Sequence, residues 1–122
     1  MSAFPGFGFF TGSEKFLLAT LRTGGVGSIN AVANLSAGVQ RRLYDNWQSA
    51  GADAIQEEIN GMRTLLQGVP VIPALKQIVA HLHHEPDWVH VRPPFTVLAP
   101  AQSSTLIAGL AAVQPLLATA AA

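Results

Sequence analysis

The order of the elements in the first 35 residues constrains the fold of this chain more than any other sequence feature. Phe7 to Phe10 is a short apolar run rich in aromatic residues, which is typical of a buried strand. Ser13 then resembles a helix N-cap, and three leucines follow it at helical spacing before Gly24-Gly25 ends the helix. Val26 to Leu35 again combines small and branched residues, as a strand buried on both faces does. Strand, helix and strand in this order predict a βαβ unit with parallel strands.

From Ser36 onward the pattern changes to helices. Ser36 can cap a helix that runs to Ala50 and is ended by Gly51. Apolar residues at helical spacing predict three further helices, over residues 52–66, 73–82 and 101–113. The loop between them contains one more strand candidate, Trp88 to Val91, which lies beside prolines.

Two parallel strands do not make a stable sheet, because parallel strands are normally covered on both faces. We therefore expect this chain to be the end of a larger α/β protein. Only 11% of its residues are charged, against about 25% in ordinary soluble domains, so much of its surface is expected to face more protein. The exposed strands predict that the chain self-associates.

Composition excludes several classes of function. The formal charge is zero and no stripe of Lys or Arg is present, so we expect neither nucleic acid nor a membrane as partner. Without cysteine there is no disulfide, thiolate nucleophile or Cys-ligated zinc, and the expected compartment is the cytoplasm. Met1 to Thr11 lacks the basic residues of a signal peptide. Leu106 to Ala122 is mostly alanine and is interrupted by Pro115, which favours a packed helix and a frayed tail over a membrane span.

Five segments in order resemble the C-terminal part of one family. They are Thr11-Gly12-Ser13-Glu14, Gly24-Gly25-Val26-Gly27-Ser28-Ile29, Ala33-Asn34, the helix around Lys76, and Val91-Arg92-Pro93-Pro94. Together they are similar to the dihydrodipicolinate synthase and N-acetylneuraminate lyase family. The resemblance implies a pyruvate-dependent class I aldolase or lyase that works through a Schiff base on a (β/α)8 barrel.

The resemblance also implies a fold class, which is the C-terminal fragment of a (β/α)8 TIM barrel with appended helices. Phe7 to Thr11 would be the seventh barrel strand, and Val26 to Asn34 the eighth. Residues 1–51 would then hold the last two βα units, and residues 52–122 the C-terminal helical region.

The resemblance implies that the residues that carry the family's chemistry lie earlier than this segment. The resemblance places the Schiff-base lysine on the sixth strand, and a tyrosine and a Thr-Thr-Gly motif before it. The lysines here are Lys15 and Lys76, and neither matches the catalytic position. We therefore expect no catalytic residue, no metal and no cofactor in this chain, which would be inactive alone. Its partners would be the missing N-terminal barrel part and, in the complete enzyme, pyruvate or another 2-oxo acid.

Three positions are candidates for substrate binding: the resemblance implies Gly12 and Ile29, and Asn30 is a polar side chain at a strand end. Gly12 would approach the pyruvate imine, although a βα turn that needs glycine is an equal alternative. The backbone carbonyl of Ile29 would face the imine, and its side chain would be core. Asn30 could contact a substrate hydroxyl or carboxylate, but an asparagine that satisfies its own turn is slightly favoured.

Other polar residues have simpler explanations than chemistry. Lys76 among apolar neighbours could be a desolvated amine, yet a lysine that snorkels along a helix is far commoner. Arg92 is fixed before two prolines, and structural anchoring to carbonyls or a carboxylate is favoured. Four histidines could suggest a metal, but they lack a ligand motif and suit a solvated helix end: His81, His83, His84 and His90. The alternative function is a non-catalytic helical interaction module that works through its exposed barrel-facing surface.

Overall fold

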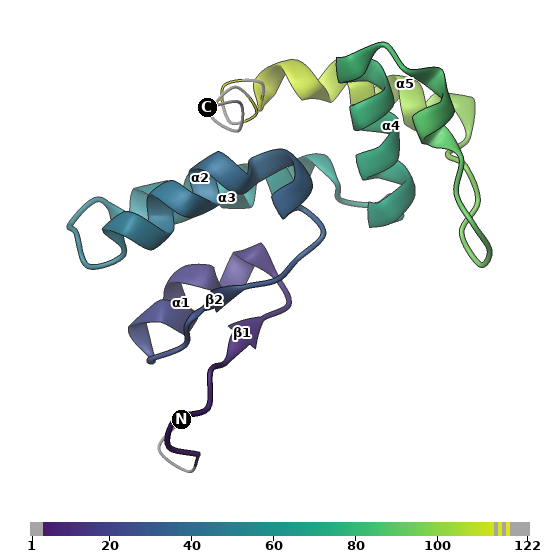
Figure 1. The fold of residues 1–122 in the computed structure, drawn as a ribbon. Coiled ribbons are helices and arrows are strands. Elements are labelled where there is room, and N and C mark those ends of the chain that lie inside the picture. Colours follow the sequence, from purple (N-terminus) through teal and green to yellow (C-terminus); the bar gives the residue numbers. More distant parts are fainter. Residues whose placement is uncertain (1–3, 114, 116, 118–122) are drawn as a thin grey trace.

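The computed structural model describes residues 4–113, 115 and 117 of the chain (Figure 1). The elements are β1 Phe10–Thr11, α1 Leu17–Arg22, β2 Gly27–Ser28, α2 Ala33–Asn46, α3 Ala52–Leu65, α4 Val71–His83 and α5 Pro100–Gly109. Short 3-10 turns precede α1, follow α4 and follow α5, as η1 Glu14–Phe16, η2 Pro86–Val89 and η3 Leu110–Ala112. The predicted alanine tail lies outside the described residues.

The predicted βαβ unit is confirmed. β1 pairs with β2 in parallel, with Phe10 opposite Gly27 and Thr11 opposite Ser28, and α1 forms the crossover. The result is a helix-rich chain with a small parallel sheet, which agrees with the α/β class. The three leucines of the crossover helix are buried, as its periodicity predicts: Leu17, Leu18 and Leu21.

The predicted strand lengths, 7–11 and 26–34, are wrong, because each strand has two residues. The backbone pairing of β2 ends at Ile29, whose N–H donates to the carbonyl of Thr11 at 3.0 Å. The chain then turns into α2, because the side-chain oxygen of Asn30 accepts the N–H of Ala33 at 2.9 Å. This side chain satisfies a free N–H at the helix start. The helix therefore begins within the segment that apolar composition assigned to a strand.

Ser36 is therefore not the start of the helix. It lies inside α2 with non-helical backbone angles, φ −128° and ψ 25°, and marks a kink. Its hydroxyl is buried and donates to the carbonyl of Val32 at 3.0 Å, which is a common cause of helix bending. Ser13 does occupy the N-cap position of η1, but its side chain makes no capping hydrogen bond.

The later helices follow their predicted periodicity, with ends that differ by a few residues. The strand prediction for Trp88 to Val91 is wrong, because Trp88 and Val89 lie in η2. The N–H groups of Trp88 and His90 donate within this turn, to the carbonyls of Glu85 and Asp87, and so are not available to a sheet.

The core consists of two apolar clusters along the α2–α3 pair, which lies at the centre of Figure 1. The cluster against α1 contains Leu17, Leu18, Leu21, Val39, Leu43, Ala52 and Ile59. The cluster against α4 and α5 contains Val32, Leu35, Met62, Leu66, Ala74, Leu75, Ile78, Leu106, Leu110 and Val113. Both α2 and α3 contribute to both clusters, so this pair joins the sheet side of the molecule to the C-terminal helices.

The sheet side carries large exposed apolar side chains. Phe7 is 69% exposed before β1, Phe10 is 50% exposed within it, and Ile29 is 73% exposed after β2. Apolar side chains in this number at one open sheet are typical of a face that another protein surface covers. Among the described residues, none of the helices has the length and hydropathy that a bilayer span requires.

Candidate functional site

Gly12 lies directly after β1, at the carboxyl end of a parallel strand, where the predicted site begins. Its φ is not in the left-handed region, unlike that of Gly24 or Gly27. A Cβ built on Gly12 would meet no atom within 4 Å. Neither the turn nor the described neighbours therefore requires glycine here, so the alternative of a turn that needs glycine loses its support.

Ile29 lies directly after β2, at the same end of the sheet as Gly12. Its side chain is exposed rather than core, which differs from the expectation for this position. Its N–H is bonded to Thr11, and within the described chain its carbonyl accepts no hydrogen bond. The carbonyl that the family resemblance assigns to the site is thus left open to a group from outside.

The Asn30 side chain is used within this chain. Besides capping Ala33, its amide nitrogen donates to Gln40 Oε1 at 2.9 Å and to Ser28 Oγ at 3.1 Å. Gln40 in turn donates to the hydroxyl of Ser36 at 2.9 Å. These contacts match the alternative of an asparagine that satisfies its turn, and a contact between Asn30 and substrate stays a prediction.

The network of Ser28, Asn30, Ser36 and Gln40 was not predicted from the sequence. Gln40 and Ser36 are buried, so their polar groups need these partners. One sequence signal points to it, since Ser36 and Gln40 are four residues apart on one helix and therefore lie on the same face. The network fixes the end of β2 against α2 and so holds the backbone of Ile29 in place.

A second unpredicted residue, Gln56 of α3, holds the other side of the site. Its side-chain oxygen accepts the N–H of Leu18 at 3.0 Å, and its nitrogen donates to the carbonyl of Glu14 at 3.2 Å. The nitrogen also donates to Asn60 at 3.1 Å. Gln56 is buried and thereby ties the segment that follows Gly12 to α3.

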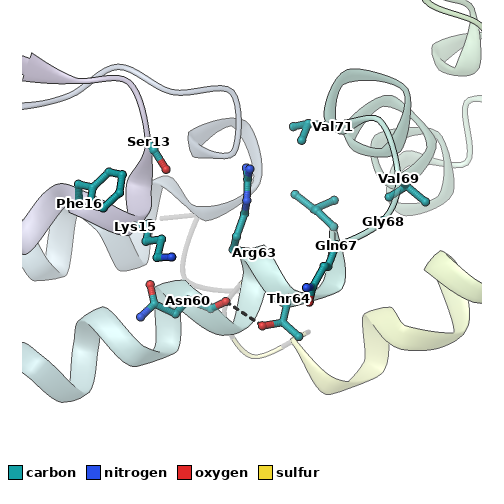
Figure 2. A pocket seen from close by; sticks show the side chains of 11 residues that line it. Ser13, Lys15, Phe16, Asn60, Arg63, Thr64, Gln67, Gly68, Val69 and Val71 are labelled. Carbon is teal, nitrogen blue, oxygen red and sulfur yellow. Dashed lines mark hydrogen bonds between the residues drawn. The ribbon is translucent and has the colours of Figure 1, made fainter.

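A hollow of about 760 Å³ begins one residue after Gly12. Figure 2 shows Arg63 standing between Ser13 and Val71, with the side chain of Lys15 pointing toward Arg63. The lining residues are Ser13, Lys15, Phe16, Asn60, Arg63, Thr64, Leu66, Gln67, Gly68, Val69 and Val71. The hollow is open and contains two cationic side chains, so it can accommodate an anionic group next to the predicted site.

Glu14 lies beside this hollow and is almost completely buried. Its Oε1 is 3.7 Å from Nη1 of Arg63 and accepts no hydrogen bond in the described chain. A buried carboxylate is costly without a partner, and Arg63 supplies the compensating charge. The ion pair therefore places Arg63 at the mouth of the hollow.

Exposed ion pairs join the helices around the site. Arg22 of α1 donates two hydrogen bonds to Asp53 of α3, at 2.9 and 2.7 Å. These bonds raise the pKa of Arg22 and lower the pKa of Asp53. Arg42 of α2 pairs with Glu58 of α3. These two ion pairs join α1 and α2 to α3, and the three helices also pack in a shared apolar cluster.

The other candidates lie away from Gly12 or on the surface. Lys15 is exposed at η1, while Lys76 is partly buried on α4. The histidines His81 and His83 lie in the last turn of α4, as the helix-end interpretation predicts. Within residues 4–113, 115 and 117, no three side chains of the metal-ligating types are grouped closely enough to hold a metal ion.

The fold and the site together define an α/β protein whose candidate site lies on the loops that follow parallel strands, which is where such proteins place their chemistry. The chain belongs to the dihydrodipicolinate synthetase family, whose family model matches residues 1–113. This confirms the family resemblance of the sequence. No curated protein and no solved structure gave a significant match.

Proposed function

We propose that this chain is the C-terminal portion of a pyruvate-dependent Schiff-base lyase or aldolase. It would supply the last two strands of a (β/α)8 barrel, together with appended helices. The Schiff-base lysine would come from the barrel segment that precedes these strands, so the chain is inactive alone. In the complete enzyme, Gly12, Ile29 and Asn30 would border the 2-oxo acid.

The observation that supports this proposal most is the glycine at position 12. Neither backbone conformation nor a close neighbour in the described chain explains it. A substrate held against the turn would explain it, because a Cβ there would occupy substrate space. The open carbonyl of Ile29 at the same end of the sheet supports the same interpretation. Both groups are backbone surfaces, which suits a part of the site that shapes it without reacting.

The experiment supplies the preceding six βα units, either in one gene with this chain or as a separate complementing chain, and measures pyruvate condensation. We expect Gly12→Val to lower kcat/KM at least about tenfold, or ~1.4 kcal/mol of transition-state stabilisation. His81→Ala at the end of α4 should change it by less than about twofold. A Cβ at Gly12 meets no described atom of this chain within 4 Å, so urea unfolding of the isolated Gly12→Val chain should match that of the starting chain and exclude instability as the cause of the loss.

A second measurement tests whether this chain lacks the reacting amine. Incubation of the chain alone with pyruvate and borohydride should give no stoichiometric covalent adduct, because neither Lys15 nor Lys76 matches the catalytic position. A mass increase mapped to either lysine would overturn that part. If the complemented enzyme tolerates Gly12→Val, the substrate-binding role of this turn is wrong. If complementation gives binding between the parts but no condensation, the helical interaction module is the better account.

A further inference from the structure

A second hollow, of about 440 Å³, lies between α4 and the segment that follows η2. Its walls are Ile72, Lys76, His90, Val91, Arg92, Pro93 and Phe95. In Figure 1 this segment is the green loop beside α4, at the opposite end of the molecule from β1. It is therefore separate from the turn that contains Gly12.

The polar groups of this hollow are all basic. Lys76, His90 and Arg92 line it, and no carboxylate does. The chain has five arginines, and four of them form ion pairs, with Asp53, Asp45, Glu58 and Glu14. Within the described residues, Arg92 has no such partner, and neither does Lys76. The sequence favoured anchoring of Arg92 to carbonyls or a carboxylate, and among the described residues its side chain forms no such ion pair.

Two of the three basic side chains, Lys76 and His90, contact neighbours outside the charge cluster. The Lys76 ammonium lies 5.6 Å from the centre of the Trp88 ring, within the range of a cation–π interaction. The His90 ring nitrogen Nδ1 is 2.9 Å from the backbone carbonyl of Asp87. Arg92 precedes Pro93, which restricts its backbone to extended conformations. Lys76 and His90 are thus partly ordered before binding, and the exposed Arg92 side chain is ordered when an anion binds.

The remaining walls of the hollow are apolar. Ile72 comes from the first turn of α4, and Val91 and Phe95 come from the segment that crosses it. A few basic groups at an apolar hollow of this volume suit a small organic molecule rather than a bare ion. Arginine in particular binds carboxylate and phosphate oxygens in pairs.

We propose that this hollow binds a small organic anion, with a carboxylate or phosphate group on Lys76 and Arg92. Its short apolar body lies against Ile72, Val91 and Phe95. The site does not depend on the proposed function, because it contains no residue of the Gly12 turn. If the folded chain binds such an anion but shows no aldolase activity after complementation, the anion site is supported and the proposed aldolase function is contradicted.

The test is a titration of the isotope-labelled chain followed by amide chemical shifts. The probes are phenyl phosphate and benzoate, with benzyl alcohol as the neutral control and inorganic phosphate as the control without an apolar body. We expect saturable shifts centred on residues 72–76 and 88–95 with the two organic anions, weaker binding of inorganic phosphate, and none of benzyl alcohol. A preference between phosphate and carboxylate will identify the group that the site recognises.

Two variants test the assigned contacts. Arg92→Gln and Lys76→Gln should each weaken binding at least about tenfold, because each removes a charge-assisted hydrogen bond. Arg41→Gln is the matched control, since Arg41 pairs with Asp45 on α2 and should leave the affinity unchanged. Shifts spread over all basic residues, or equal affinity in Arg92→Gln and Arg41→Gln, would overturn the proposal. Absence of shifts in a chain with dispersed, folded spectra would do the same.

Discussion

Replacement of Gln56 by methionine tests how the segment after Gly12 is held. Methionine has a similar length and fits an apolar surrounding, but it cannot accept the N–H of Leu18 or donate to the carbonyl of Glu14. In the folded chain these bonds are 3.0 and 3.2 Å long and both are buried. The change therefore removes these two hydrogen bonds, and a third to Asn60, with little change in volume.

The expected loss of stability depends on which hydrogen-bonding partners of Gln56 lose their only partner. The carbonyl of Glu14 keeps a second partner, because the N–H of Leu17 also donates to it. The side chain of Asn60 is partly exposed and can turn to water. The N–H of Leu18 keeps no such replacement, and an orphaned buried donor costs about 1–3 kcal/mol. We therefore expect Gln56→Met to lower the free energy of unfolding by about 1–3 kcal/mol.

The assay is urea unfolding followed by far-UV circular dichroism, at one fixed chain concentration because association adds to apparent stability. Gln48→Met is the matched control, since Gln48 is exposed and should stay within about 0.5 kcal/mol of the starting chain. Hydrogen exchange at the Leu18 amide should become faster in Gln56→Met. Equal stability of the two methionine variants, with unchanged exchange at Leu18, would refute the role of Gln56.

Three further outcomes follow from the contacts around the site. Arg22→Gln should raise the pKa of Asp53 in an NMR pH titration, because hydrogen bonds from Arg22 lower this pKa in the folded chain. The ion pair stabilises the fold above the pKa that Asp53 has in the unfolded chain, and this stabilisation is lost as the pH falls through the pKa of Asp53 in the folded chain. Gly25→Ala should destabilise by about 1–3 kcal/mol in urea unfolding, because its Cβ would lie 2.9 Å from a backbone carbonyl, whereas Gly61→Ala in open space on α3 should not destabilise. The chain should sediment as oligomers, and Phe7→Ser on the exposed sheet side should reduce the association; a monomer in both cases would contradict the exposed-sheet argument.

The helices could be predicted from the sequence because their cores are periodic. Ile59 and Met62 of α3, and Leu75 and Ile78 of α4, recur at helical spacing and are all buried. Periodicity reports which face is apolar, and in these helices the apolar face is the one that packs. The βαβ order was readable for the same reason, together with the paired glycines that end the crossover helix.

The strand ends and the polar network could not be predicted in this way. The length of β2 depends on Asn30, whose side chain caps the next helix instead of continuing the sheet. Gln56 bonds to Leu18 and Glu14, which lie 38 and 42 residues away, so nothing in its own neighbourhood indicates the role. Polar contacts at such separations depend on tertiary packing, which no local pattern encodes.

The glycines near the sheet differ in whether contacts or backbone angles within this chain explain them. Gly25 is required from within, because its N–H bonds to the carbonyl of Thr20 at 2.7 Å and no side chain fits there. Gly27 is also required from within, by a backbone φ of 155°. Gly12 has neither requirement, although Gln56 fixes the segment on one side of it and β1 fixes the other. Under the proposed function, a rigid turn without an internal need for glycine contacts the substrate. We therefore expect substitution at Gly12 to lower activity without unfolding the chain, and substitution at Gly25 to affect both folding and activity.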